Sequence, residues 1–401
     1  MADSSEWIPV PDDEDPLSQK ILLMGARRSG KTSAMEVLFH GMEARQTIPS
    51  VSPTHDIKIE NVNIFAPYQI WDTPGSITAE NFGDNLKKFS VLIYFVDMIS
   101  GYTEQIQSIA MTFLAAHRCN PDMQLYLFIN KADGITGKDT LTETFREIQD
   151  YVQDDMTDFS NEEIDAIPEV SFFLTSIYDR RLAYAFSQVI RQSLMVAQFL
   201  SGMMNSWVVT AQMDKSFLID KKTKLYVATD GAPVQNAVYT TCVDWVTRII
   251  AYEELYTSVV PVGQKTIDEK SEALFRDASD RTGNFFDAID GYETESDSES
   301  EGGPESEERI DGEVEEVDDE EEDEDEDEDG EGNEDYEDYP SQILTLSSGI
   351  TYGYWEITPD LALIGSLNTH IYNKKTEHIE ESIGVVRKFT LKFLKAQRMT
   401  E

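Results

Sequence analysis

A glycine-rich segment near the start of the chain contains the residue types that bind phosphate. Residues 25–32 read GARRSGKT and match the pattern G-x-x-x-x-G-K-[ST], directly after a predicted strand and before a predicted helix. In this setting, backbone N–H groups and the helix N-terminus converge on a phosphate. We expect Lys31 to reach the β- and γ-phosphates and the Thr32 hydroxyl to bind Mg²⁺. The predicted phosphate-binding residues are Gly25, Arg28, Ser29, Gly30, Lys31, Thr32 and Ser33.

A second motif predicts which base the nucleotide carries. Residues 130–133 read NKAD and lie at the end of the run LYLFIN, about 100 residues after the phosphate loop, where open α/β sheets bind nucleotides. Asp133 can accept hydrogen bonds from both the ring N–H and the exocyclic amine of guanine. Adenine lacks that donor pair and would leave the carboxylate unpaired, at a cost of about 1–3 kcal/mol. Lys131 can lay its stem along the purine and Asn130 can brace the loop, so we expect guanine.

A third motif has the pattern D-x-x-G of a γ-phosphate sensor. It is DTPG at residues 72–75, although the same letters alone are equally consistent with an ordinary turn. Asp72 would hold Mg²⁺ through a water, and the Gly75 N–H would donate to the γ-phosphate, so that loop order depends on the nucleotide. The remaining contact with Mg²⁺ is expected from Thr54, with Thr47 as its competitor.

Hydrolysis would depend on positioning and charge, because the sequence offers no recognisable general base. Lys31 and Gly75 would contact the transition state, and the backbone of Ser176 and Ile177 would contact the guanine O6. Many GTPases carry a Gln after D-x-x-G to orient the attacking water, whereas this chain has Ser76. A serine hydroxyl is too short for that task. We therefore expect weak intrinsic GTP hydrolysis that depends on an activating protein.

The elements that position these motifs alternate between strands and helices. Short apolar runs, bounded by glycine or polar residues, are interleaved with helical patterns, which predicts a doubly wound, mostly parallel α/β domain over residues 19–200. The predicted strands are Ile21–Met24, Gln69–Trp71, Val91–Asp97, Leu125–Asn130 and Ser171–Leu174.

Beyond residue 200 the pattern changes. Residues 216–220 and 224–230 predict a β-hairpin, and Val234–Tyr256 has a helical apolar period. Alternation resumes over Gln342–Leu367 and is followed by an amphipathic helix over Thr376–Lys395. These pieces predict two halves of one small α/β domain.

A long acidic segment separates the two halves. Of the formal net charge of −45, residues 290–338 supply −29, with 30 acidic residues and one basic residue. We predict a disordered insertion over residues 262–339, since it has too few apolar residues to offset the entropy of ordering. It is either a tolerated solvated loop or a docking arm for a basic partner, tuned by phosphorylation. With no basic face elsewhere, nucleic acid is not expected as a partner.

The cysteines and the N-terminus bear on the compartment. The two cysteines, Cys119 and Cys242, lie in different predicted domains, so a disulfide framework is not expected. Residues 1–18 are rich in proline and acid and predict a disordered tail without a secretory pattern, and Ala2 excludes N-myristoylation. No apolar run approaches the roughly 20 residues that span a bilayer. We expect no direct membrane insertion, and any membrane location would come through a partner.

Taken together, these segments resemble the Rag GTPase family. The resemblance rests on ILLMGARRSGKTS, QIWDTPG, NPDMQLYLFINKADG, SFFLTSIYD and FLIDKKTKLYVATDGAPV, and is greatest to the C/D-type branch that includes the second fungal Gtr protein. It implies a roadblock-type (longin-like) dimerisation domain over 203–261 and 340–401, and a heterodimer with an A/B-type Rag subunit. It further implies a scaffold complex on the cytoplasmic face of the vacuole or lysosome, and control of the target-of-rapamycin kinase complex by amino acids.

The chain departs from this family in three places. Members of the branch usually have His where this chain has Asn130, the residue of GTPases in general, which favours guanine binding. The residue after D-x-x-G is Ser76, and the acidic insertion is not part of the family pattern. Ser76 keeps open the alternative of a guanine-nucleotide-binding scaffold subunit with negligible hydrolysis. A P-loop kinase or ATPase is disfavoured by N-K-x-D. The signalling nucleotide state and the exchange factors stay open.

Overall fold

The computed structural model describes residues 7–11, 19–160, 167–194, 196–257 and 340–399. They form two β-sheets, and the described residues up to 254 and from 340 onward belong to one compact unit. The predicted acidic insertion and most of the predicted tail lie outside the described residues. The domain boundary near residue 200 stays a prediction.

The first sheet contains the strands that the motifs require. Its order is β2-β3-β1-β4-β5-β6, parallel throughout except for β2, which pairs antiparallel with β3. Every residue of the central strand β4 is buried, as expected for a strand covered on both faces. The predicted P-loop α/β class is confirmed. The strands are β1 (Gln19–Met24), β2 (Lys58–Ile64), β3 (Ala66–Asp72), β4 (Val91–Asp97), β5 (Gln124–Asn130) and β6 (Val170–Leu174).

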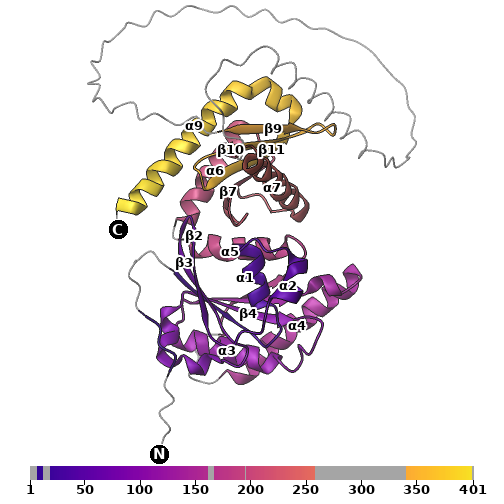
Figure 1. The fold of residues 1–401 in the computed structure, drawn as a ribbon, viewed down its shortest axis with the longest axis vertical. Coiled ribbons are helices and arrows are strands. Elements are labelled where there is room, and N and C mark those ends of the chain that lie inside the picture. The colour runs from indigo at the N-terminus through magenta and orange to yellow at the C-terminus, as the bar shows by residue number, and fades with distance from the viewer. Residues whose placement is uncertain (1–6, 12–18, 161–166, 195, 258–339, 400–401) are drawn as a thin grey trace, which may run out of the picture. The chain divides into compact units, whose positions relative to one another are not determined.

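Helices cover both faces of this sheet (Figure 1). Ile21 and Leu23 of β1 belong to the core under α1 and α5, whereas Leu22 and Met24 belong to the core under α3 and α4. This follows from the period of two in a strand. The helices are α1 (Lys31–Phe39), α2 (Ala44–Ser50), α3 (Ile106–Cys119), α4 (Lys138–Phe159) and α5 (Arg181–Ser193), with 3₁₀ turns η1 (Ala79–Asn81), η2 (Gly83–Lys88) and η3 (Ala132–Gly134).

The second sheet is antiparallel and has the order β8-β7-β11-β10-β9. Because β7 pairs with β11, residues on either side of the long gap at 258–339 share one sheet, which confirms the predicted interrupted α/β unit. Its strands are β7 (Lys215–Asp220), β8 (Tyr226–Thr229), β9 (Ser341–Thr345), β10 (Ile350–Glu356) and β11 (Leu361–Asn368), and its helices are α6 (Ala197–Ala211), α7 (Asn236–Thr257) and α9 (Thr369–Met399).

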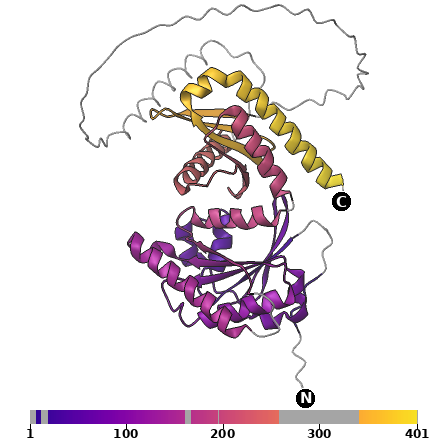
Figure 2. The same cartoon turned by 180° about the vertical axis from the view of Figure 1, so that it is seen from behind.

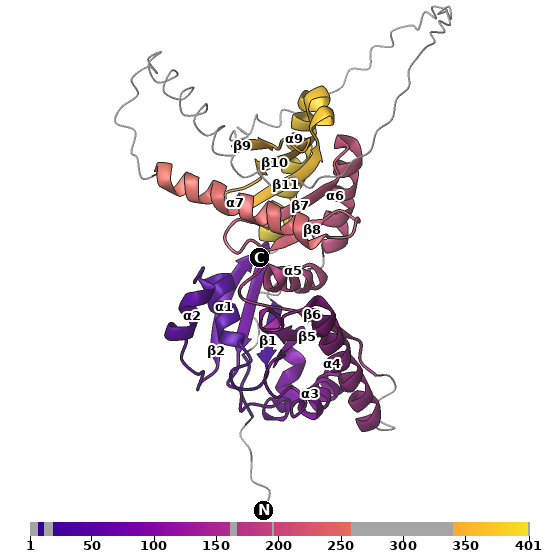
Figure 3. The same ribbon diagram turned by 90° about the vertical axis from the view of Figure 1, so that its right-hand side faces the viewer.

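The two faces of the second sheet have different helices. Tyr354 of β10 contacts Trp245 of α7, while the next residue, Trp355, contacts Trp207 of α6 at a ring distance of 5.7 Å. Figure 3 shows α7 against the sheet, and α6 and α9 lie side by side in Figure 2. Helix α9 consists of two helical parts divided at Lys375, which has non-helical dihedral angles, and the second part begins at the predicted Thr376.

Five residues of the predicted tail are ordered. Ile8 N–H donates to the Asn81 carbonyl at 2.9 Å, Asn85 Nδ2 donates to the Ile8 carbonyl at 2.9 Å, and Val10 is only 4% exposed. Residues 7–11 therefore differ from the prediction of disorder over residues 1–18, because their apolar side chains join the core beneath η1 and η2.

No single helix in the described part of the chain is long and apolar enough to cross a membrane, although the bent pair α5 and α6 meets that length and composition together.

Candidate nucleotide-binding site

The phosphate loop needs glycine at two positions for steric reasons. Gly25 has φ +136°, and a Cβ there would lie 2.2 Å from the Phe95 carbonyl oxygen of β4. Gly30 has φ +100°, and its Cβ would lie 2.3 Å from Asn130 Nδ2. A side chain at either place would push the loop away from its neighbouring strands. The two glycines therefore set the closeness of the phosphate loop to the NKAD loop.

Lys31 is buried with backbone carbonyls as its neighbours. Its Nζ donates to the Gly25 oxygen at 2.6 Å and to the Ala26 oxygen at 3.3 Å, and the residue is 6% exposed. Burial lowers the pKa of Lys31 to about 8, and the charge of Asp72 opposes that shift only in part. A phosphate in this loop would supply the negative charge that these contacts lack.

Three oxygen side chains meet beside Lys31. Thr32 Oγ1 donates to Asp72 Oδ2 at 2.6 Å and lies 2.6 Å from Thr54 Oγ1. Thr47 Oγ1 instead donates to the Ala44 carbonyl within α2. The structure therefore brings Thr54, and not its competitor, to the other two oxygens.

This cluster fits a hard cation. Burial raises the pKa of Asp72, with the Thr32 hydrogen bond and Lys31 opposing, and its Oδ1 is buried without a hydrogen-bond partner among the described residues. The Ser29 Oγ of the phosphate loop is also buried without a hydrogen-bond partner among the described residues. Magnesium prefers one or two carboxylates together with hydroxyls, waters and phosphate oxygens. The three side chains Thr32, Thr54 and Asp72 form a donor set of that kind.

The D-x-x-G turn lies directly against the phosphate loop. A Cβ on Gly75 would be 2.3 Å from the Arg27 nitrogen and 2.7 Å from the Ala26 carbonyl carbon. Thr73 anchors the turn, since its Oγ1 donates to the Leu23 carbonyl at 2.7 Å. Gly75 can therefore reach a terminal phosphate held in the loop, while larger residues cannot approach as closely.

The NKAD loop is tied to both neighbouring loops. Asn130 Nδ2 donates to the Ser29 carbonyl at 2.8 Å, and Thr175 Oγ1 donates to Asn130 Oδ1 at 3.2 Å. Ser176 Oγ donates to Asp133 Oδ1 at 2.5 Å. Asn130 thus links the phosphate and base loops, and Ser176 orients the carboxylate predicted to recognise guanine.

These loops enclose a cavity of about 530 Å³. Among the predicted residues, Gly25, Asp72 and Ser176 support the cavity from behind without lining it. Arg27, Ile99 and Tyr178 line it and were missed. Their positions after β1, β4 and β6 could have suggested them, because the carboxyl ends of parallel strands meet at one edge. The predicted residues that line the cavity are Arg28, Ser29, Gly30, Lys31, Thr32, Ser33, Thr54, Gly75, Asn130, Lys131, Asp133 and Ile177.

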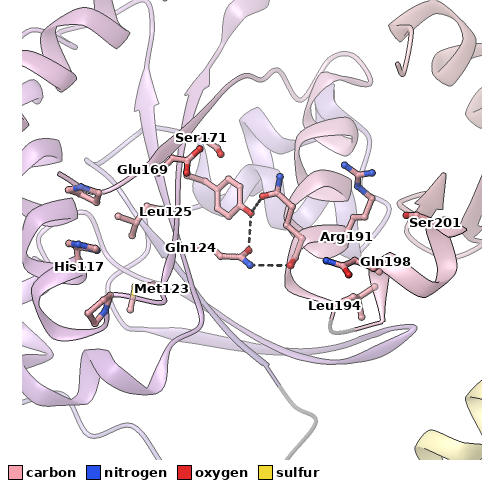
Figure 4. Close-up of a pocket in the computed structure, with 15 residues that line it drawn as sticks. His117, Met123, Gln124, Leu125, Glu169, Ser171, Arg191, Leu194, Gln198 and Ser201 are labelled. Atoms are coloured by element: carbon pink, nitrogen blue, oxygen red, sulfur yellow. Dashed lines mark hydrogen bonds between the residues drawn. The ribbon is translucent and has the colours of Figure 1, made fainter. Parts of the chain in front are cut away.

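A second cavity, of about 690 Å³, lies at the opposite ends of β5 and β6 (Figure 4). Its polar side chains bind one another: Tyr126 Oη donates to Gln192 Oε1 at 2.5 Å, and Gln124 Nε2 donates to the Gln192 carbonyl at 3.1 Å. None of the predicted site residues lines it. Because ligands of open α/β sheets bind at the carboxyl ends of the strands, the smaller cavity is the candidate nucleotide site.

Comparison with known proteins agrees with this geometry. The Gtr1/RagA G protein conserved region matches residues 20–247, which is more than half of the 401 residues. The chain belongs to the Gtr1/RagA family of G proteins. Among its relatives, human Ras-related GTP-binding protein C is 32% identical over 275 residues, covering 66% of this chain and 67% of the relative.

Two further Rag/Gtr relatives show which branch the chain resembles. GTP-binding protein gtr2 of Schizosaccharomyces pombe is 30% identical and covers 59% of this chain and 75% of the relative. Rat Ras-related GTP-binding protein B is 25% identical and covers 53% and 64%. The predicted likeness to the C/D-type branch is confirmed, and the chain is a GTP-binding protein of the Rag/Gtr family.

Proposed function

We propose that this chain is a regulatory switch that binds GTP or GDP with Mg²⁺ and hydrolyses GTP slowly. The observation that carries the proposal is the convergence of Thr32, Thr54 and Asp72 beside Lys31, with Gly75 against the phosphate loop. Nucleotide extracted from the purified protein tests it. Guanine nucleotide with Mg²⁺ dependence is the expected result, and adenine nucleotide would refute the proposal.

The chain's own residues would bind, orient and stabilise charge. Lys31 and the backbone N–H groups of the loop hold the phosphates, and the Gly75 N–H donates to the γ-phosphate. Thr32 and Thr54 would hold Mg²⁺, and Asp72 would accept a hydrogen bond from a water bound to it. When bound, Mg²⁺ would supply positive charge that offsets the negative charge of the phosphate oxygens. Asp133, oriented by Ser176, accepts from guanine.

Hydrolysis without help is slow in this proposal, because the exposed Ser76 cannot reach a water as a Gln would. The second candidate function, a nucleotide-binding scaffold with negligible turnover, rests on the same residue. Single-turnover hydrolysis of bound GTP, with and without a GTPase-activating protein, separates the two. Strong acceleration by the activating protein supports the switch, and no turnover in either condition supports the scaffold.

The second sheet, as a roadblock-type dimerisation domain over 203–261 and 340–401, is proposed to bind an A/B-type Rag subunit. The outer strand β9 pairs only with β10 among the described strands, and Ile343 on it is 37% exposed. Tyr252 of α7 is 61% exposed. Among the described strands, β9 is an edge strand with an exposed apolar side chain, and such an edge favours pairing with another chain. Co-expression with an A/B-type subunit should give a one-to-one complex by mass, and a stable monomer in that experiment would remove the dimer.

The resulting heterodimer is proposed to act on a vacuolar or lysosomal scaffold and to control the target-of-rapamycin kinase complex according to amino-acid supply. Similarity to the C/D-type and gtr2 relatives supports this role. Expression in Saccharomyces cerevisiae cells that lack GTR2 tests it. Restored amino-acid activation of the kinase by the native chain, and not by Thr32→Asn, supports the role, whereas no restoration despite heterodimer formation contradicts it.

A further inference from the structure

Lys131 of the NKAD loop is fixed at its backbone and at its tip. Its φ is +65°, in the left-handed region, and the flanking Ala132 N–H donates to the Thr175 carbonyl at 3.1 Å. At the other end, Lys131 Nζ lies 2.6 Å from Asp97 Oδ2. The methylene stem between these two anchors has little rotational freedom, although the side chain is 35% exposed.

Asp97, the last residue of β4, is held firmly in place. Its side chain is 8% exposed and accepts from the Ile99 N–H at 2.9 Å and from Ser100 Oγ at 2.6 Å. Burial opposes ionisation of Asp97, but the hydrogen bonds from Lys131, Ser100 and Ile99 outweigh it and hold the pKa of the carboxyl below its usual value. Asp97 is therefore a rigid, charged anchor.

Only one residue of the Asp97–Lys131 pair lines the nucleotide cavity. Lys131 and Ile99 line it, whereas Asp97 does not. Any influence of Asp97 on the nucleotide must therefore pass through a neighbour. Its strongest contact toward the cavity is the Lys131 ammonium.

We propose that Asp97 is a positioning residue that sets how long guanine nucleotide stays bound, by holding the Lys131 stem flat where the purine lies. This rests on the proposed guanine binding at the NKAD loop. A lysine with a free ammonium would lose rotamer entropy each time a nucleotide bound, whereas the anchored lysine is already ordered. The anchor also keeps the ammonium from turning toward the phosphates.

A different role for Asp97 would be to stabilise only the loop between β4 and α3, through Ile99 and Ser100. The two roles differ in one respect. If Asp97 acts through Lys131, its loss matters only while Lys131 carries an ammonium. If it stabilises the loop, its loss matters whatever residue stands at 131.

The test is the dissociation rate of a fluorescent GDP from the full chain in Asp97→Asn, Lys131→Met and the double variant. We expect Asp97→Asn and Lys131→Met each to release GDP about tenfold faster, since each loses a charge-assisted contact. The double variant should release it no faster than Lys131→Met. Equal acceleration by Asp97→Asn in both backgrounds, or no acceleration at all, would overturn the proposal.

Two further variants of the chain serve as controls for this experiment. Asp84→Asn removes the charge from the Lys87–Asp84 pair of η2, where the side chains are 58% and 72% exposed, and should leave GDP release unchanged. If Asp97→Asn does not fold, Asp97→Glu keeps the charge while displacing it by one methylene, and faster release only with Lys131 present supports the anchor. Wild-type protein that binds no guanine nucleotide would contradict the proposed function itself, a result distinct from the outcomes above.

Discussion

Two buried lysines, one in each sheet region, have the same exposure and different neighbours. Lys31 and Lys215 are both 6% exposed. Lys215 Nζ lies 3.0 Å from Asp230 Oδ1 and donates to the Ala232 carbonyl at 2.5 Å, whereas Lys31 Nζ contacts only carbonyl oxygens in the described structure. The difference teaches that a buried lysine paired with its own carboxylate cannot be removed without leaving that carboxylate unpaired, whereas a buried lysine without one is placed to bind an external anion.

Removal of the charge at position 215 gives the largest expected effect. Lys215→Met leaves Asp230 buried without its ion pair, so we expect a loss of about 3–5 kcal/mol in the free energy of unfolding. Thermal unfolding followed by circular dichroism measures this loss of stability. The control is GDP affinity at a temperature where the variant is still folded, which should be unchanged. An unchanged melting temperature would show that the Lys215–Asp230 pair is not needed for the stability of the fold.

The matching change at position 31 should affect binding instead. Lys31→Met removes an ammonium that burial disfavours, so the nucleotide-free protein should be at least as stable as the native one. GDP affinity should fall about 100-fold, the equivalent of roughly 2.7 kcal/mol for lost charge-assisted phosphate contacts. Titration calorimetry gives the affinity, and a melting temperature that falls as far as in Lys215→Met would contradict the distinction.

The ionisation of Lys31 should make both stability and nucleotide binding depend on pH. The pKa of Lys31 in the folded protein is about 8, below the usual lysine value of 10.5, so folding disfavours the protonated form. Stability of the nucleotide-free protein should therefore rise between about pH 8 and 10.5 as the charge is lost. Because phosphate favours the ammonium, binding near pH 8 should take up a proton. Calorimetry in buffers of different ionisation enthalpy detects the uptake, which Lys31→Met should abolish.

A smaller effect is expected at Thr54, and a variant there distinguishes the contribution of the predicted Mg²⁺ ligands from that of Lys31. Thr54→Ala keeps Lys31 and Thr32 and removes one metal ligand, so GTP affinity should fall a few-fold, within the roughly 0.5–1.5 kcal/mol of one neutral contact. GDP affinity should change less. Thr47→Ala is the matched control, because the Thr47 hydroxyl binds within α2. An equal loss of GTP affinity in both variants would contradict the role of Thr54 as a ligand of Mg²⁺.

The motifs and the strands that bear them were predictable from the sequence because they are local patterns. The phosphate loop needs its glycines within a few residues, and β4 is a continuous apolar run. The fold class of both sheets followed from such runs. The sequence favoured Thr54 but left Thr47 as a competitor, because both hydroxyls lie in one short segment and only the path of the chain separates them.

The sequence by itself determined the GTP-binding class of this protein, since residues 25–32, 72–75 and 130–133 state the phosphate and base chemistry in consecutive letters. Only the tertiary structure decided which distant groups meet. The 2.6 Å pair of Asp97 and Lys131 exists because β4 and β5 are neighbours and end at the same edge. Residues 7–11 are ordered because a distant apolar surface covers Val10. Such contacts depend on strand order and burial, which no local pattern of residues specifies.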